Sequence, residues 1–156
     1  MFIDRQSGSR LTTDMARTMT RNGLWRDIPL GLFQEQSAAR DPRKTAIVAH
    51  TVATGERVEF TYEEYEARSA ALAASLAELG VKPKDVVAIQ LPNWWEFAVS
   101  AFAVLRLGAT YTGLLPAFRQ REVSFILKRA SAKVLIVSSD FHGFSYEQLL
   151  AEVRPQ

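Results

Sequence analysis

The sequence contains no cysteine and only two histidines, which removes several kinds of chemistry from consideration. Without cysteine, the chain can build neither a disulfide framework nor a thiolate nucleophile or metal site. His50 and His142 lie far apart in the sequence, with no spacing that would pair them on a metal. Each is therefore expected to be structural or exposed, and no metal-binding residue is predicted.

The chain also lacks a long hydrophobic run and a large excess of charge. Its longest apolar stretch, residues 94–107, is interrupted by Glu96 and Arg106, whereas a membrane-spanning helix needs about 20 apolar residues. The 19 lysines and arginines nearly balance the 17 acidic residues, which leaves a net charge of +2. This composition predicts no membrane span and no nucleic-acid partner. Residues 94–107 are expected to form a buried helix.

Several motifs of enzyme active sites are missing as well. The sequence has neither the nucleophile elbow Gly-x-Ser-x-Gly nor the dinucleotide pattern Gly-x-Gly-x-x-Gly. Gly108 and Gly113 have the glycine spacing of a phosphate loop, but Leu114 and Leu115 follow in place of lysine and serine or threonine. The two glycines are better explained as a helix end and a bend at a strand end. No catalytic residue is predicted in this chain.

Residues 1–27 do not look like part of a folded core. They combine arginines with serine and threonine, as transit peptides do, but they also carry Asp4, Asp14 and Asp27 and lack the apolar core of a secretory signal. We expect a poorly ordered N-terminal extension with a short helix at residues 13–20. With no convincing targeting segment and no cysteine, a cytoplasmic location is expected.

From residue 28 onward, the hydrophobic pattern alternates between helical and strand periods. Helices are expected at residues 28–40, 62–79, 94–107, 119–130 and 146–153, and strands at 45–51, 57–61, 86–91, 109–114 and 134–137. The first two strands flank a turn at Gly55 and predict a β-hairpin. The last three alternate with helices, which indicates a parallel sheet with right-handed crossovers. The fold class is α/β, a β-hairpin followed by a βαβαβ parallel sheet with helices on both faces.

Local signals indicate where two of these helices begin and end. Thr61 and Glu64 have the spacing of a capping box, in which the hydroxyl accepts from a first-turn amide and the carboxylate reaches back to the cap amide. Gly80 supplies the left-handed conformation that ends this helix. Asn93 is expected to cap the following apolar helix, and Gly108 to end it.

Five runs in a fixed order carry a resemblance to a known family. They are FTYEEY at 60–65, AALA at 70–73, LGVKPKDVVAIQLPN at 79–93, LRLGATY at 105–111, and PAFRQREV at 116–123 continuing to AKVLI at 132–136. Together they resemble the AMP-forming acyl-CoA synthetases of the adenylate-forming ligase fold. They look most like the branch acting on cyclic, aromatic or medium-chain carboxylic acids. The resemblance implies that residues 28–156 form an incomplete N-terminal α/β subdomain of an AMP-dependent ligase.

The resemblance also implies an activity and its cofactors. Members of this family use ATP and Mg²⁺ to activate a carboxylate as an acyl-adenylate, and then transfer the acyl group to coenzyme A. In the family, a Ser/Thr/Gly-rich loop ending in Pro-Lys holds the phosphates. A metal-binding carboxylate, a ribose-binding aspartate and a catalytic lysine follow further along the sequence. None of these motifs occurs in this sequence. The chain is therefore expected to be a truncation, inactive by itself and without a cofactor of its own.

Two short stretches are expected to approach a ligand in a complete enzyme. Asn93 and Trp94 begin a helix at the carboxyl end of a parallel strand, where open α/β sheets bind ligands, and are candidates for the substrate site. Alternatively, neither residue contacts a ligand: Asn93 only caps the helix, and Trp94 only packs within the protein. His142 and Gly143 follow the third parallel strand. In related ligases the loop at this position approaches the coenzyme A nucleotide, often with arginine, so the resemblance makes these residues candidates for a cofactor site.

Two other interpretations of the chain stay open. One is a stand-alone, non-catalytic α/β binding or interaction module, and the other is one half of a split ligase that assembles with a separate catalytic chain. A sheet of three crossover strands leaves at least one edge and part of one face uncovered. We therefore expect partners of two kinds: the remaining portion of a ligase in trans, or a second copy through self-association.

Overall fold

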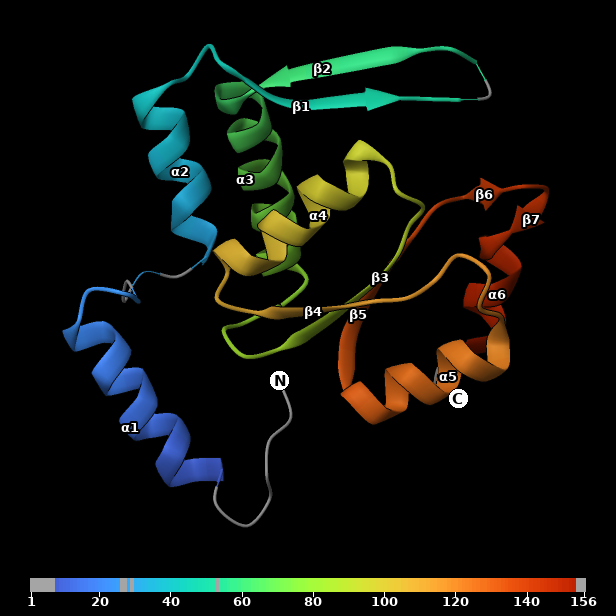
Figure 1. Ribbon diagram of the computed structural model, residues 1–156. Helices are drawn as coiled ribbons and strands as arrows, with labels where there is room; N and C mark the ends of the chain where they lie inside the picture. Colours follow the sequence, from blue (N-terminus) through green and yellow to red (C-terminus); the bar gives the residue numbers. More distant parts are fainter. Residues whose placement is uncertain (1–7, 26–27, 29, 53, 154–156) are drawn as a thin grey trace.

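The structure is a computed structural model that describes residues 8–25, 28, 30–52 and 54–153. The helices in these residues are α1 (Gly8–Arg21), α2 (Leu30–Arg40), α3 (Tyr62–Glu78), α4 (Trp95–Arg106), α5 (Gln120–Ala130) and α6 (Tyr146–Val153) (Figure 1). The strands are β1 (Thr45–His50), β2 (Arg57–Thr61), β3 (Val86–Gln90), β4 (Thr110–Gly113), β5 (Ala132–Val137), β6 (Asp140–Phe141) and β7 (Phe144–Ser145). In this part of the chain, no helix is long and apolar enough to cross a membrane.

A three-stranded parallel sheet in the order β4-β3-β5 forms the centre of the fold. The middle strand, β3, pairs with both neighbours, and Ala88 lies between Thr112 on one side and Leu135 on the other. Val87, Ala88, Ile89 and Gln90 are all 0% exposed. The expected βαβαβ parallel sheet is therefore confirmed, and its first strand in sequence lies in the middle.

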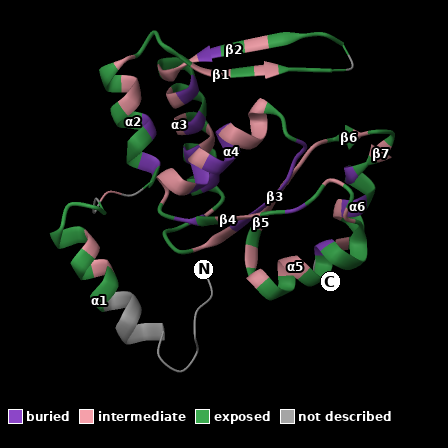
Figure 2. Cartoon of the chain, in the orientation of Figure 1, coloured by how far each residue is buried: buried purple, intermediate pink, exposed green. Residues whose placement is uncertain are grey.

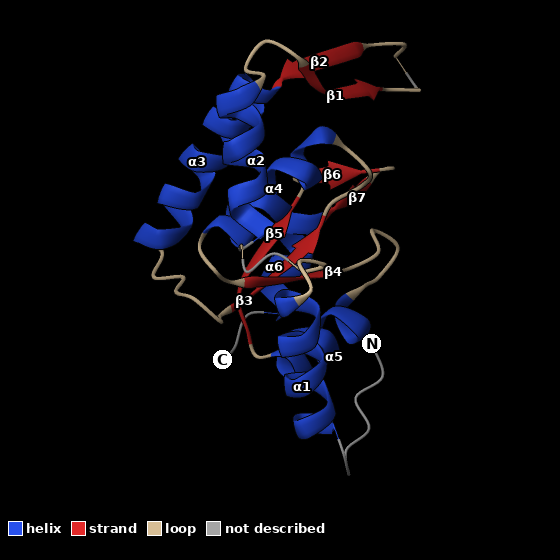
Figure 3. Ribbon diagram, turned by 60° about the vertical axis from the view of Figure 1, so that its left-hand side comes forward, coloured by secondary structure: helices blue, strands red, loops and turns tan. Residues whose placement is uncertain are grey.

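The two faces of β3 are covered by different pairs of helices. Side chains alternate along a strand, so Val87 and Ile89 point to one side and pack in a cluster with residues of α3 and α4. Ala88 points to the other side and packs with Val123 of α5 and Leu149 of α6. This arrangement confirms helices on both faces, and the helices are seen on either side of the strands in Figure 3. Strand β3 is thus shared by two hydrophobic clusters.

The antiparallel hairpin β1–β2 packs against α3 and α4. Phe60, Tyr65 and Val99 form its buried cluster. The Phe60 ring meets Trp95 edge to face at 5.0 Å, and the Tyr65 hydroxyl donates to the carbonyl of Ala98 at 3.0 Å. Burial raises the pKa of Tyr65 well above its ordinary value. The hairpin therefore fixes the start of α4, which leads into the candidate site.

Helix α2 lies against α4 at a very short distance. A Cβ added to Gly31 would come within 2.6 Å of the Arg106 Cα, so this contact requires glycine. Beside this contact, Arg106 Nη1 forms a salt bridge with Glu66 Oε1 at 2.6 Å. The Ser69 hydroxyl donates a hydrogen bond to Gln34 Oε1 at 3.2 Å. Figure 2 shows that the buried residues concentrate in α3, α4 and β3, whereas α1 has none among those coloured.

Several element boundaries differ from the sequence-based expectation. The short helix expected at residues 13–20 is part of the longer α1, and the helix expected from residue 28 begins at Leu30. Strand β5 begins two residues earlier than expected, at Ala132. The poor order expected of the N-terminal extension stays a prediction. Its residues 1–7 and 26–27 lie outside the described residues, as do residues 154–156 of the proposed subdomain.

The capping box at the start of α3 is confirmed. The Glu64 N–H donates to the Thr61 hydroxyl at 3.3 Å, and the Thr61 N–H donates to the Glu64 carboxylate at 2.8 Å. This second bond lowers the pKa of Glu64. Gly80 and Gly108 have φ angles of +86° and +68°, the left-handed conformation expected after α3 and α4. Hydrogen bonds within a few residues therefore set the limits of α3.

Replacing Thr61 with alanine should lower the free energy of unfolding by about 0.5–2 kcal/mol, because an orphan amide of the first turn loses its acceptor. Thr61→Asp should be nearly neutral, since its carboxylate still accepts from the same amide. Urea denaturation followed by circular dichroism measures both differences. Equal midpoints for the wild type and the alanine variant would contradict the contribution of this cap.

Candidate functional site

The carboxyl edge of the parallel sheet contains two hollows. After β3 the chain passes to the face covered by α3 and α4, whereas after β4 and β5 it passes to the face covered by α5 and α6. Neighbouring strands whose connections leave toward opposite faces create a crevice at their carboxyl ends. One crevice lies between β3 and β5, the other between β3 and β4. This edge is therefore the place where the fold can hold a ligand.

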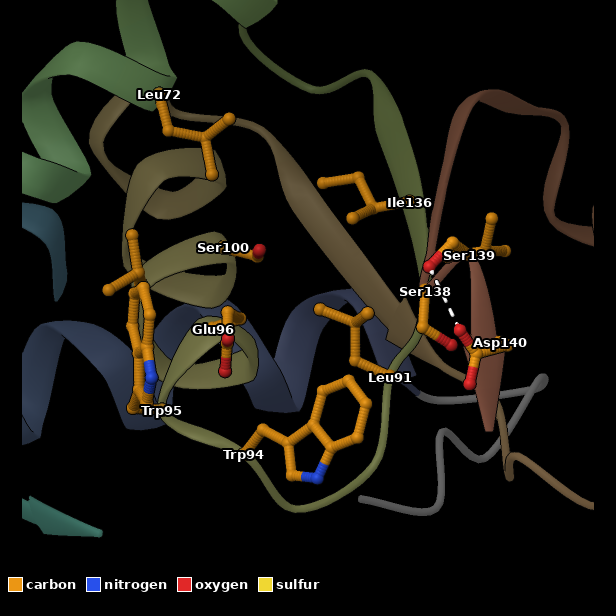
Figure 4. A pocket seen from close by; sticks show the side chains of 12 residues that line it. Leu72, Leu91, Trp94, Trp95, Glu96, Ser100, Ile136, Ser138, Ser139 and Asp140 are labelled. Atoms are coloured by element: carbon orange, nitrogen blue, oxygen red, sulfur yellow. Dashed lines mark hydrogen bonds between the residues drawn. The ribbon is translucent and has the colours of Figure 1, made fainter. Parts of the chain in front are cut away.

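The β3–β5 hollow is a cavity of about 510 Å³ with an apolar floor and a polar rim (Figure 4). It is lined by Leu72, Leu91, Trp94, Trp95, Glu96, Val99, Ser100, Ile136, Val137, Ser138, Ser139 and Asp140. The Ser138 Oγ is buried without a hydrogen-bond partner among the described residues, while the Ser139 hydroxyl donates to Asp140 at 3.4 Å. A free hydroxyl beside apolar walls suits a ligand that is mostly apolar with a few polar atoms.

Trp94 forms part of the wall of this hollow. It is the N-cap residue of α4, with extended backbone and no side-chain capping bond, and the residue is 37% exposed. The ring meets Phe141 edge to face at 5.7 Å. Trp95 contacts Phe60 instead, although its side chain also reaches the hollow. The packing role considered for Trp94 and a ligand-contacting role are therefore compatible.

The capping role predicted for Asn93 is wrong. The helix begins one residue later than expected, at Trp95, so the cap position falls on Trp94. The shift arises because the chain makes a tight turn after β3, in which the Trp94 N–H donates to the Pro92 carbonyl at 2.7 Å. Asn93 is exposed and its amide is not used to cap α4.

Asn93 lies at the other crevice, the β3–β4 hollow. This cavity of about 420 Å³ is lined by Leu91, Pro92, Asn93, Phe97, Gly113, Leu114, Leu115 and Pro116. Asn93 and Trp94 were predicted as one substrate site, but they line different hollows that share Leu91. The structure therefore places the two candidates on opposite sides of the carboxyl end of β3.

His142 and Gly143 form the two-residue turn of a small hairpin, β6–β7. Their φ angles of +52° and +75° are both positive, as in a type I′ turn, and Phe141 pairs with Phe144 across the hairpin. The Phe141 and His142 rings have centroids 4.1 Å apart. Because Phe141 also contacts Trp94, the turn is connected to the rim of the β3–β5 hollow. This hairpin was not predicted from the sequence, in which its signal is Gly143 between two aromatic residues.

The loop between β4 and α5 is held by side chains from two elements, β3 and α6, and these bonds were not predicted from the sequence. Buried Gln90 donates from Nε2 to the carbonyls of Leu115 and Phe118, at 3.0 and 3.1 Å. The Tyr146 hydroxyl donates to the Pro116 carbonyl at 2.8 Å. These bonds fix the wall of the β3–β4 hollow to β3 and α6.

Arg119 completes this clamp at the start of α5. Its Nη1 donates to the carbonyls of Pro116 and Phe118, at 2.8 and 3.0 Å, and its guanidinium lies 3.8 Å from the centre of the Phe144 ring. The loop and the β6–β7 hairpin are thereby joined. Both candidate regions therefore belong to one connected framework at the carboxyl edge.

The arrangement is suited to binding and positioning. Among residues 8–25, 28, 30–52 and 54–153, no group of three or more histidine, cysteine, aspartate or glutamate residues could hold a metal ion. The carboxylates at the β3–β5 hollow, Glu96 and Asp140, belong to different elements, α4 and β6. The described residues thus offer apolar walls, indole and amide groups, and hydroxyls, but no metal centre.

Comparison with known proteins places these features in context. The family model described as AMP-binding enzyme matches residues 34–156. Triostin synthetase I of Streptomyces triostinicus is 36% identical over 141 residues, which are 90% of this chain and 26% of that protein. The medium-chain fatty-acid–CoA ligase of Escherichia coli (strain K12) is 32% identical over 121 residues, 78% of this chain and 20% of the ligase. The apo structure of MbtA from Mycobacterium smegmatis superposes with a TM-score of 0.73 at 30% identity, over 90% of this chain and 25% of that one.

The chain thus spans only 20% to 26% of the length of these relatives. The similarity covers the hairpin, the parallel sheet and both hollows, because the matched residues begin within α2 and extend to the end of the chain. It supports the adenylate-forming ligase fold of this part of the chain.

The β6–β7 turn gives a direct test of the site geometry. His142→Asn should raise the free energy of unfolding by a few tenths to about 1 kcal/mol, because asparagine tolerates a positive φ better than histidine. His142→Val should lower it, since a β-branched residue is strained in this conformation. Urea denaturation of the wild type and the two variants measures the order of their free energies of unfolding. Unfolding midpoints in any other order would contradict the left-handed conformation at His142.

Proposed function

Because the chain belongs to the AMP-binding enzyme family and has the fold of the N-terminal part of adenylate-forming ligases, we propose that it supplies this part of an ATP-dependent acid–thiol ligase. Such a ligase converts a carboxylic acid to an acyl-adenylate and then to a coenzyme A thioester. The observation that carries the proposal is the family match over residues 34–156, which includes the whole carboxyl edge.

The acid is proposed to be cyclic, aromatic or of medium chain length. The β3–β5 hollow supports this class because its floor is made of aliphatic side chains and its wall of the Trp94 indole. A flat or flexible apolar group gains from contact with both kinds of surface. Asn93, on the other side of β3, is proposed to contact the acid from the β3–β4 hollow.

The His142–Gly143 turn is proposed to lie next to coenzyme A. It is exposed at the carboxyl edge, and Phe141 connects it to Trp94. An imidazole and an unhindered glycine backbone suit hydrogen bonding to a nucleotide. The described residues do not fit a Mg²⁺ site, so no step involving the metal or the ATP phosphates is assigned to this chain. Its own contribution is to position the acid and the thiol carrier.

The purified chain should therefore be catalytically silent. We expect no ATP–pyrophosphate exchange dependent on benzoate, cyclohexanecarboxylate or octanoate, because the sequence contains no phosphate loop ending in Pro-Lys. Radiolabelled pyrophosphate incorporation measures the exchange against a control without protein. Exchange that stays above this control through successive purification steps would contradict the prediction.

A chimera tests the proposed role directly. Residues 34–156, which match the family model, would replace the corresponding segment of the E. coli medium-chain fatty-acid–CoA ligase, which is 32% identical to this chain over 121 residues. A soluble chimera should retain octanoate-dependent pyrophosphate exchange, because the segment supplies the same structural part. A folded chimera without exchange, tested beside the active parent ligase, would contradict the proposal.

Variants of this chimera separate the two candidate regions. Trp94→Ala should raise the KM for octanoate about tenfold, through the loss of an aromatic wall worth about 1.4 kcal/mol. His142→Asn keeps the turn and removes the imidazole, so it should raise the KM for coenzyme A and leave pyrophosphate exchange unchanged. Val52→Ala, at a residue that is 98% exposed in the connection between β1 and β2, is the control for both. Unchanged KM values would refute the assigned contacts.

A further inference from the structure

The β3–β5 hollow contains a buried serine whose hydroxyl has no hydrogen-bond partner among the residues that the structure describes. This residue, Ser100 of α4, lines the hollow and is only 3% exposed. The hydroxyl of a helical serine can bond to the carbonyl one turn earlier, as that of Ser75 does to Ala71 at 3.4 Å. Ser100 makes no such bond, so its hydroxyl is available to a ligand.

Ser100 lies in the inner part of the hollow. It is buried, whereas Trp94 and Asp140, which line the same hollow, are exposed. Its side chain projects from α4 toward Ile136 and Ser138 on the opposite wall (Figure 4). An unpaired hydroxyl between apolar walls costs free energy, which a ligand atom that hydrogen-bonds to it recovers.

The charges of the lining residues limit what can occupy this inner part. Half-buried Glu96 and exposed Asp140 are the charged residues of the lining, and it contains no lysine, arginine or histidine. A carboxylate placed deep in the hollow would lose its hydration without gaining a cation. The inner part therefore suits an uncharged group that forms hydrogen bonds.

The size of the hollow allows such a group to be carried on a ring or a short chain. Its volume of about 510 Å³ is within the range of small-molecule sites. Leu72 and Val99 add aliphatic surface to the walls around Ser100. The hollow thus combines apolar contact with one hydrogen-bonding position.

We propose that Ser100 determines specificity in the β3–β5 hollow, and that its hydroxyl binds a hydroxyl group at the apolar end of the ligand. The inference rests on the proposed function in one respect, namely that this ligand is the acid. It narrows the acid to one whose ring or chain carries a hydroxyl remote from the carboxylate. The hydroxyl end enters the hollow first, and the carboxylate stays outside.

Titration of the purified chain with phenol and with toluene, followed by NMR, tests the inference. The two probes differ by a hydroxyl in place of a methyl group, and neither carries a carboxylate. A purely apolar hollow prefers toluene, because phenol must lose the hydration of its hydroxyl. We expect phenol to bind the wild type at least as tightly as toluene. In Ser100→Ala the ratio of the two affinities should fall about fivefold, because the hydrogen bond is lost.

Ser75→Ala is the matched control, because it removes an exposed helical hydroxyl outside the lining of the hollow. It should keep the wild-type ratio. Alanine favours helix, so both variants should fold, which their NMR spectra check. Nuclear Overhauser effects from the phenol ring to the methyl groups of Leu72 and Ile136 locate the probe without any variant.

Several results would overturn the proposal. These are a preference of the wild type for toluene, a ratio that Ser100→Ala leaves unchanged, contacts of phenol outside the hollow, or no binding of either probe. None of them depends on acid activation. Failure of the inference is therefore distinguishable from failure of the proposed function, which the pyrophosphate exchange of the chimera tests.

Discussion

The burial of β3 is the constraint on which the rest of the structure depends. Four consecutive residues of this strand, from Val87 to Gln90, are fully enclosed. Since neighbouring side chains point to opposite faces, such a strand is stable only where helices cover both sides and strands pair along both edges. The order β4-β3-β5, the two pairs of covering helices and the crevices at the carboxyl edge all follow from this requirement.

Features that depend on neighbouring residues could be predicted from the sequence. The capping box of Thr61 and Glu64 needs only a hydroxyl and a carboxylate three residues apart, and both bonds are present. The glycines after α3 and α4 adopt the left-handed conformation that their positions indicated. The alternation of helices and strands, and hence the α/β class with a parallel sheet, followed from hydrophobic periods that buried elements must show.

Features that depend on distant residues could not be predicted in this way. The capping role of Asn93 failed because the turn after β3 is closed by a backbone bond to Pro92, which moves the helix start by one residue. The separation of Asn93 and Trp94 into two hollows that share Leu91 could not be predicted either, because it depends on how the strand end packs, and their role at a substrate site stays a prediction. The bonds from Gln90 and Tyr146 to the β4–α5 loop join residues far apart in sequence, so no local pattern indicates them.

The central claim is that a doubly covered β3 organises the sheet and the two hollows at its carboxyl edge. Native-state hydrogen exchange measured by NMR tests it most directly, because the most deeply buried strand exchanges only on global unfolding. The account predicts that amides of β3 exchange slowest, with a free energy of opening equal to that of global unfolding, and that those of β4 exchange faster. Slowest exchange in the β1–β2 hairpin, with early opening of β3, would contradict the account.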